Sequence, residues 1–501
     1  MKTLNILKQS WPVVILLLTT VIITSCKKDF LDRKPLGEYI EEDIPPGDLN
    51  AQVYAIYAAL REDGISSLPY IAVHNIRSDD ADKGSTVSDG ADAEAIFDNF
   101  QYTTDFWLIN QYWSDHYNLI AMANNVIDAV DSVGLESEVT RVNLGEAKFF
   151  RAYAYFDMVR AFGEVPLIDF RILRQEDAIK PKATVADIYG LIDEDLEEAI
   201  AYLPTNWDPS FIGRVTKGSA LTLRTKSYMA RQMYGQALST ARMVMESGEY
   251  NLNMSYEQIF RESGENGSES IFEIQALYTQ NQTDVGLNYA SRQGVRGGGV
   301  WDLGWGWNTP NERLAAAFEE GDPRKDETLL YSGQINTPYG EEVPAATSEL
   351  PRPYWSKKVY TDPAIRRSAG SLQGQWFNMR VYRYADLVLL AAEAANETGD
   401  RVSALNYLET VRARARGNNE EVLPEVTAED QVELREAIRH ERQVELGMEN
   451  ERFFDLVRWG IDIEVMHEAG KTGYQERHRY LPIPQPEIDR SGGVLVQNPN
   501  Y

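Results

Sequence analysis

Cysteine is almost absent from the sequence, because the 501 residues include only Cys26. A lone cysteine excludes an intramolecular disulfide, and at this place in the chain it is better suited to acylation than to catalysis. Histidine is also scarce, and the five histidines show none of the spacings typical of metal ligands: His74, His116, His440, His467 and His478. No Ser-His-Asp or phosphate-loop pattern stands out either. We therefore expect no catalytic residue, no metal and no cofactor.

Positive charge is in short supply as well. The chain has 49 lysines and arginines against 77 aspartates and glutamates, and its formal net charge is -28. Such a chain repels nucleic-acid phosphates and anionic lipid head groups unless a local basic patch intervenes. The largest basic cluster falls at the end of a predicted helix, where arginine interacts favourably with the helix dipole: Arg412, Arg414 and Arg416. We therefore expect no nucleic-acid partner.

No apolar run in the sequence is long enough to span a membrane. The longest, Val13 to Ile23, has eleven residues, which are too few to cross about 30 Å of bilayer hydrocarbon as a helix. Lysines precede this run, and a sequence similar to a bacterial lipobox, ITS, leads from it directly to Cys26. We predict that residues 1–25 are a lipoprotein signal peptide that is cleaved, that Cys26 is lipidated, and that residues 26–48 are a lipid-anchored tether.

Apolar residues at helical spacing dominate the rest of the chain, whereas strands are few. Helices are predicted from Asp48, as the cap, to residue 62, over 109–130 and up to a break at Gly163. The best strand candidates are residues 270–275 and 380–383. The sequence therefore predicts a mostly α-helical protein.

Three segments have the length of tetratricopeptide helix pairs, with small residues where two helices would meet. They are residues 149–162 with 183–203, residues 218–250, and residues 383–415. We predict that these pairs form a scaffold. Ordinary helical hairpins without a true repeat are the alternative, since the copies diverge in sequence and lie far apart.

The second half of the chain contains two long irregular stretches, 286–310 and 335–374, which are rich in Gly, Pro, Ser and Thr. Loops of that size usually carry function. Because helical segments lie on both sides of them, we predict one intertwined domain over residues 49–501. Its loop-rich ligand-binding region is expected at about 260–380.

Residues 296–310, RGGGVWDLGWGWNTP, contain three of the ten tryptophans and follow no steady helical or strand period. An indole is a large, rigid apolar plate that suits the C–H face of a sugar ring. Neighbouring glycines let the backbone approach a ligand. We predict a carbohydrate platform made of Trp301, Trp305 and Trp307 together with Tyr289. The alternative for each tryptophan is burial beneath the loop.

A second candidate group lies nearer the start of the chain. Arg77, Asp79 and Asp80 precede a polar loop, and such side chains form bidentate hydrogen bonds to vicinal sugar hydroxyls. A solvated turn held by aspartate capping is the alternative. We expect Trp107 to join the platform, whereas Trp113 has the helical spacing of a core residue.

The segment IRHERQVELGMENERFFDLVRWG is dense in charge. Paired carboxylates can hydrolyse a glycosidic bond. However, opposite charges three residues apart are what a partly exposed helix uses for stability: Arg442 with Glu445, Glu449 with Arg452, and Asp455 with Arg458. We predict structural ion pairs here rather than an active site.

Several stretches, taken in order, resemble the SusD/RagB family of outer-membrane nutrient-binding lipoproteins. They are KKDFLDRKPLG after Cys26, EAKFFRAYAYFDMVRAFGEVPLI, RYADLVLLAAEAANETGD, ALNYLETVRARA, the charged segment above, and the chain end YLPIPQPEIDRSGGVLVQNPNY. The resemblance implies a helical fold of four tetratricopeptide-like units, with an irregular second half that contributes most of the ligand surface. It also implies surface display as a lid on a TonB-dependent transporter of the SusC type. Such proteins bind oligosaccharides, or in some members peptides, and are not enzymes.

We therefore predict a surface-exposed outer-membrane lipoprotein that binds a glycan and delivers it to a SusC-like transporter. One alternative is a peptide-binding lid of the RagB type, in which the platform would be deeper and the tryptophans less exposed. Another is a glycan hydrolase, which needs two carboxylates across the aromatic cleft, although the loop supplies only Asp302. A purely structural or adhesive scaffold would bury its tryptophans and bind no ligand.

Overall fold

The structure is a computed structural model, and it describes residues 49–86 and 88–501. The predicted signal peptide, the lipidation site Cys26, the tether and the Asp48 cap lie outside the described residues. Residues Leu49–Tyr501 contact one another as one unit.

The two longest helices, α6 (Trp107–Val133) and α7 (Glu138–Phe162), follow each other in the chain and pack together. Helix α2 (Asn50–Ala59) lies against both of them. Aromatic and small apolar residues of α7 are buried on nearly all sides, so this helix is the centre of the main hydrophobic core. It ends where Gly163 takes a φ of 73°, a left-handed conformation that favours glycine and stops a helix. The predicted break at Gly163 is confirmed.

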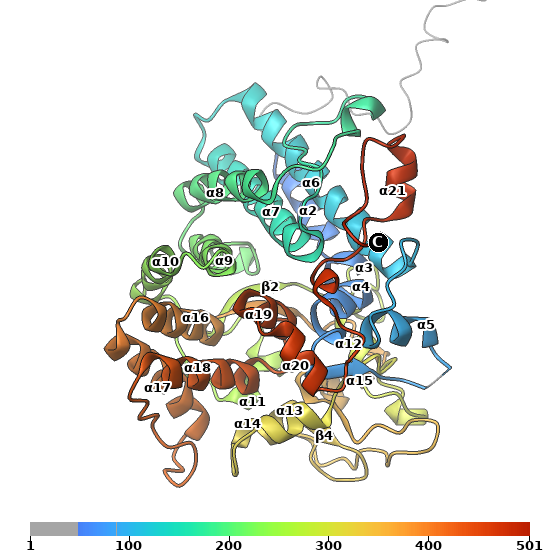
Figure 1. Ribbon diagram of the computed structural model, residues 1–501, viewed down its shortest axis with the longest axis vertical. Coiled ribbons are helices and arrows are strands. Elements are labelled where there is room, and N and C mark those ends of the chain that lie inside the picture. Colours follow the sequence, from blue (N-terminus) through green and yellow to red (C-terminus); the bar gives the residue numbers. More distant parts are fainter. Residues whose placement is uncertain (1–48, 87) are drawn as a thin grey trace, which may run out of the picture. The chain divides into compact units, whose positions relative to one another are not determined.

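Helix pairs continue from α7 along one side of the protein (Figure 1). In order, α7 packs on α8, α8 on α9, α9 on α10, α10 on α16, and α16 on α17. Alanines at these contacts are fully buried and let the helices approach closely. The bounds of these helices are α8 Val185–Tyr202, α9 Lys217–Ala230, α10 Tyr234–Glu246, α16 Tyr384–Glu397 and α17 Arg401–Arg416. The prediction of a mostly helical fold with helix pairs is confirmed.

Across residues 49–86 and 88–501, strands are few and short, and they form three two-stranded antiparallel sheets. Strand β2 (Ser270–Ile274) pairs with β6 (Met379–Arg383), so the two predicted strands pair with each other. Strand β1 (Ala81–Lys83) pairs with β3 (Asn308–Pro310), and β4 (Leu329–Tyr331) pairs with β5 (Tyr354–Ser356). The β2–β6 and β4–β5 pairs join parts of the irregular second half to one another. The β1–β3 pair joins this half to the N-terminal part of the chain.

Short elements fill the remaining chain. The short α-helices of the first half are α3 Asp63–Ser66, α4 Leu68–Ile71 and α5 Ala91–Ala93, beside π-helical turns η3 Ala72–Ile76 and η4 Glu94–Asp98. Those of the irregular region are α11 Tyr256–Ile259, α12 Tyr289–Gln293, α13 Glu312–Ala317, α14 Pro323–Thr328 and α15 Pro363–Ala369. The C-terminal helices are α18 Gln431–Leu446, α19 Arg452–Trp459, α20 Asp462–Glu468 and α21 Gln485–Arg490. Turns of 3-10 helix are η5 Gln175–Ala178, η6 Pro209–Phe211, η7 Glu262–Gly264, η8 Gly299–Trp301, η9 Lys357–Val359 and η10 Glu476–Arg479.

Within the described part of the chain, no helix has both the length and the apolar character needed to cross a membrane.

The charged segment of α18 and α19 differs from its prediction, because about half of its charges are buried and most of them pair with other elements. Glu445 accepts hydrogen bonds from Arg324 of α14 at 3.0 Å, from Arg383 of β6 at 2.7 Å, and from Arg414 of α17. Arg442 pairs with Asp386 at 2.8 Å and with Asp455 at 2.9 Å.

Of the three predicted pairs within the segment, Asp455 with Arg458 forms, at 2.8 Å. Arg452 instead binds Asp79, and Glu449 instead binds Lys358 and Arg383. The charges form structural ion pairs, as predicted, and α18 is partly exposed, but most of the pairs join its buried face to other elements. The buried network holds the irregular second half against the helices.

Candidate functional site

Trp305 is the most accessible of the three loop tryptophans, with 42% of its surface exposed. Its backbone N–H donates to Ser291 O at 2.8 Å, which fixes the loop onto α12. Gly304 makes this approach possible, because a Cβ there would lie 2.2 Å from Ser291 O. This glycine therefore serves the packing of the loop on its own chain, whereas the prediction gave it a role in backbone approach to a ligand.

Two arginines flank the Trp305 ring. The guanidinium carbons of Arg292 and Arg296 lie 6.0 Å and 5.6 Å from its centroid, within the range of cation–π attraction. Arg296 donates to Ser85 Oγ at 2.6 Å and pairs with Asp89, and Arg292 lies 3.6 Å from Asp63. The indole is therefore held by fixed neighbours and is already ordered for a ligand.

Asp63, at the start of α3, completes the polar surroundings of Trp305. Its carboxylate accepts from Asn288 Nδ2 at 3.2 Å and faces Arg292. Carboxylate, amide and guanidinium groups can together bind a pair of neighbouring hydroxyls. We call Trp305, Arg292, Arg296, Asn288 and Asp63 the Trp305 surface.

The second exposed indole is Trp107, the first residue of α6, with 50% of its surface exposed. It lies one helical turn before Gln111, so the two side chains share a face of α6. Gln111 and the backbone N–H of Gly64 both donate to the Asp115 carboxylate, at 3.0 and 2.8 Å. Helix α3, which holds both Asp63 and Gly64, thus connects the Trp107 end of α6 with the Trp305 surface.

The remaining members of the predicted aromatic platform are less accessible. Trp301 is half-buried and packs against Tyr360, with ring centroids 5.9 Å apart. Trp307 is buried over Gly90, where a Cβ would lie 2.3 Å from the indole. Tyr289 is buried, and its hydroxyl accepts from Asn450 Nδ2 at 3.0 Å. The prediction that Trp307 and Tyr289 contact a ligand is therefore wrong: both fill the core beneath the loop.

Arg77, Asp79 and Asp80 are fully buried, so their predicted contact with sugar hydroxyls is also wrong. The Arg77 guanidinium lies 3.8 Å over the ring of Phe453. The Asp79 carboxylate accepts from Arg452 at 2.8 Å and from Arg313 at 3.0 Å.

Asp79 acts on the loop indirectly. It anchors the residues before β1, and β1 pairs with β3 directly after the tryptophan loop. Asp79 is thus a positioning residue for the Trp305 surface.

Burial and the neighbouring charge of Asp79 raise the pKa of Asp80 to about 7. The folded protein therefore binds more protons than the unfolded chain between about pH 4 and pH 7, and its stability falls as pH rises through that window.

We predict that Asp80→Asn, which can still accept a hydrogen bond from Gln443, stabilises the protein at pH 8 by as much as about 4 kcal/mol, at 1.36 kcal/mol per pKa unit. At pH 4 the variant and wild type should have about the same free energy of unfolding. Urea unfolding at pH 4 and pH 8 measures both proteins. If the variant were more stable than wild type by the same amount at both pH values, the prediction would be contradicted.

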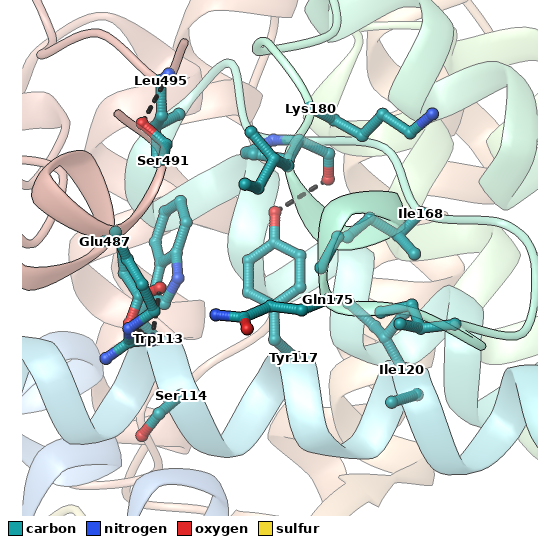
Figure 2. Close-up of a pocket in the computed structure, with 16 residues that line it drawn as sticks. Trp113, Ser114, Tyr117, Ile120, Ile168, Gln175, Lys180, Glu487, Ser491 and Leu495 are labelled. Atoms are coloured by element: carbon teal, nitrogen blue, oxygen red, sulfur yellow. Dashed lines mark hydrogen bonds and ion pairs between the residues drawn. The ribbon is translucent and has the colours of Figure 1, made fainter. Parts of the chain in front are cut away.

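Two hollows away from the Trp305 surface are alternative candidates for a sugar site. Figure 2 shows the first, a pocket of about 270 Å³, in which Trp113 and Tyr117 rise from α6 beside Glu487 of α21, with Ile168 on the other side. The Tyr117 hydroxyl already donates to Pro166 O at 2.7 Å, and Lys180 extends its ammonium group away from the rings. The lining of this pocket is mainly apolar, so it offers a sugar less polar surface than apolar surface.

The second hollow, of about 750 Å³, lies among α7, α9, α18 and α19. Its arginines are paired with carboxylates: Arg442 with Asp386 and Asp455, Arg458 with Glu393 and Asp455, and Arg231 with Asp193. Its charge is therefore internally balanced and gives no preference for an anionic ligand.

The carboxyl group of Asp98 is not placed as the general acid of a glycosidase would be. A general acid needs a raised pKa and an open position facing the substrate. Burial raises the pKa of Asp98 to about 6, but its carboxylate binds Lys471 at 3.1 Å. Among residues 49–86 and 88–501, no three or more His, Cys, Asp and Glu side chains are grouped so as to hold a metal ion.

Comparison with known proteins decides the family. Residues 268–501 match the SusD family, and residues 29–229 match the family described as "Starch-binding associating with outer membrane". The chain belongs to the SusD/RagB family. Proteins of this family are non-catalytic, glycan-binding and associated with the outer membrane.

Similar proteins cover nearly the whole SusD-like chain. SusD-like protein P2 of Formosa agariphila is 27% identical over 97% of this chain and 98% of its own. A SusD-like protein of Bacteroides ovatus is 26% identical over 88% of this chain and 81% of its own.

Solved structures are similar to this chain over most of its length as well. A laminarin binding SusD-like protein is 27% identical, with a TM-score of 0.76 over 91% of this chain and 99% of its own. A SusD homolog from Bacteroides thetaiotaomicron, 22% identical with a TM-score of 0.78 over 92% of this chain and 98% of its own, shares the fold. The family resemblance of the sequence is confirmed.

Sequence reasoning missed the polar half of the Trp305 surface. Arg296 is the first residue of the tryptophan loop and Arg292 lies four residues before it, which was an available signal. Asp63 gave none, because it lies more than 200 residues away and reaches the loop only in the folded protein.

Proposed function

We propose that this SusD-like protein captures an oligosaccharide or polysaccharide on the Trp305 surface and delivers it to a SusC-like TonB-dependent transporter. In this proposal a lipid on Cys26 anchors the protein to the outer membrane at the cell surface. The observation that carries the binding step is the exposed, rigidly held Trp305 with its two arginines and Asp63. Sugar rings would stack on the indole, and their hydroxyls would bind the polar groups beside it.

The first ligand to test is laminarin, because the solved structure of a laminarin binding SusD-like protein is 27% identical to this chain. The accessible positions of Trp305 and Trp107 favour a sugar over a peptide, since a peptide-binding lid was expected to have less exposed tryptophans. The proposal includes no bond cleavage.

The binding step is tested with the chain lacking residues 1–26, which keeps the whole described unit. Affinity electrophoresis against laminarin and a panel of other polysaccharides should show retardation by at least one neutral glycan. Chromatography of the incubated glycan should show no shortened products. If wild type is retarded by none of the glycans, or if it shortens the one that it binds, the proposed function is wrong.

A further inference from the structure

A second cluster of exposed aromatic side chains lies on the loop between α8 and α9. Phe211 is 43% exposed and its neighbour Ile212 is 60% exposed, while Tyr54 of α2, also exposed, contributes a ring from another part of the chain. Trp207 is half-buried, and its ring centroid lies 6.0 Å from that of Phe211. Aromatic groups gathered on a surface in this way mark contact sites.

A single guanidinium orders the cluster. The Arg214 guanidinium carbon lies 3.8 Å from the centroid of Trp207 and 5.5 Å from the centroids of Tyr54 and Phe211. Arg214 is held in turn by the fully buried carboxylate of Glu146, with its Nε donating at 2.8 Å. The indole N–H of Trp207 donates to Val215 O at 2.9 Å. We call Tyr54, Trp207, Phe211, Ile212 and Arg214 the Arg214 patch.

A hollow of about 370 Å³ adjoins the patch, within the size range of small-molecule sites. Trp207 and Ile212 line it with apolar surface, and its polar lining residues include Asn206, Asp208, Glu249, Tyr250, Asn266 and Ser268. Asn206 Nδ2 donates to Glu249 at 3.3 Å across this lining. An aromatic wall beside amide, hydroxyl and carboxylate groups is suited to sugar rings, which have an apolar face and a polar edge.

The charge of the hollow indicates the kind of sugar. Asp208 and Glu249 both line it, while the charge of Arg214 is balanced by Glu146. Carboxylates at the rim repel uronates and sulfated sugars. A neutral glycan therefore fits this surface best.

Helix α2 links the patch to the Trp305 surface. Tyr54 lies in the first half of α2, and Asp63 follows shortly after its end. The helix has ten residues and is about 15 Å long at 1.5 Å per residue. A glycan of many units can reach over such a distance, and binding at two linked positions strengthens its attachment.

From these contacts we infer that the Arg214 patch is a second binding surface for neutral glycan, which holds a polysaccharide together with the Trp305 surface. This inference rests on the proposed function, because both surfaces are taken to bind the same class of ligand. The ordered indole and the polar hollow beside it carry the inference.

The test compares Phe211→Ala and the double variant Trp207→Ala, Phe211→Ala with wild type, by affinity electrophoresis in whichever polysaccharide wild type binds. Trp459→Ala is the matched control, because Trp459 is also half-buried, lies 5.0 Å from the guanidinium carbons of Arg439 and Arg458, and donates its indole N–H to Glu393 at 2.8 Å. We expect the double variant to lose at least fivefold in polysaccharide affinity, Phe211→Ala to lose a smaller part, and the control to lose none. Circular dichroism confirms that each variant is folded.

A second set of variants, made in a protein that lacks Trp107 and Trp305, distinguishes binding at the Arg214 patch from binding at the Trp305 surface. In a Trp107→Ala, Trp305→Ala protein, residual polysaccharide binding should persist and should disappear when Trp207→Ala, Phe211→Ala is added. If polysaccharide affinity is unchanged by the Trp207 and Phe211 variants, the inference is overturned and the patch is left as a surface for a protein partner. If wild type binds no glycan, the proposed function itself is wrong. That result is distinguishable from glycan binding that does not depend on the Arg214 patch.

Discussion

Trp305→Ala is expected to weaken glycan binding by about 10- to 30-fold, which corresponds to about 1.4 to 2 kcal/mol of binding free energy. The reason is that the indole is the widest exposed apolar plate on the Trp305 surface, and Arg292 and Arg296 already hold it in place. Isothermal titration of the best-binding oligosaccharide measures the loss. Removal of the half-exposed ring leaves the core intact, so the unfolding temperature should change little.

Two comparisons keep this result specific. Trp305→Phe retains a stacking plate and should recover most of the affinity. Trp307→Ala removes a buried ring and should lower the unfolding temperature, since deletion of a buried aromatic side chain costs about 3–5 kcal/mol. If binding depended on Trp307 in folded protein and not on Trp305, the assignment of the surface would be contradicted.

Glu445→Gln is expected to lower the free energy of unfolding by about 3–5 kcal/mol, the usual effect of breaking a buried ion pair. Glu445 is fully buried and accepts hydrogen bonds from Arg324, Arg383 and Arg414, whose uncompensated charges would stay in the interior. Burial opposes the charged form, yet these arginines hold the pKa of Glu445 well below its ordinary value. Its stabilising contribution is therefore present above about pH 4.5 and is lost as pH falls towards the folded-state pKa.

Glu436→Gln is the matched control, because Glu436 lies on the same helix and is exposed, with Arg439 at 3.0 Å. An exposed pair contributes about 0–1 kcal/mol, so this variant should unfold almost as wild type does. Urea unfolding at pH 7 compares the two substitutions. Equal small losses would show that Glu445 is not the centre of the network that joins the irregular region to the helices.

The long helices and the strands β2 and β6 could be predicted from the sequence because their signals are local, whereas the three-residue strands β1, β3, β4 and β5 were not predicted. Apolar spacing identified α6, α7 and the helix pairs, and β-branched and aromatic residues identified β2. The burial of charge was not predictable in the same way. A spacing of three residues is the same whether a helix faces water or other helices. The partners Asp386 and Arg383 lie 56 and 62 residues before Arg442 and Glu445, the α18 residues that they pair with.

The tryptophan loop shows the same limit at the level of single residues. Trp305 and Trp307 are two positions apart in a glycine-rich sequence, and nothing local separates the exposed ring from the buried one. Gly90, some 200 residues earlier, makes the difference. It has no side chain, so the Trp307 ring can pack directly against its backbone. Likewise Asp79 and Asp80 look like ligand contacts in sequence, but Arg313, Arg452 and Gln443 bury them.

The most direct test of the account is a crystal structure of the chain lacking residues 1–26 in complex with an oligosaccharide from the polysaccharide that it binds. We predict sugar density stacked on the indole of Trp305, with hydroxyls within hydrogen-bonding distance of Asp63 or Arg292. Density confined to the pocket of Trp113 and Tyr117, with the Trp305 surface empty, would contradict the account.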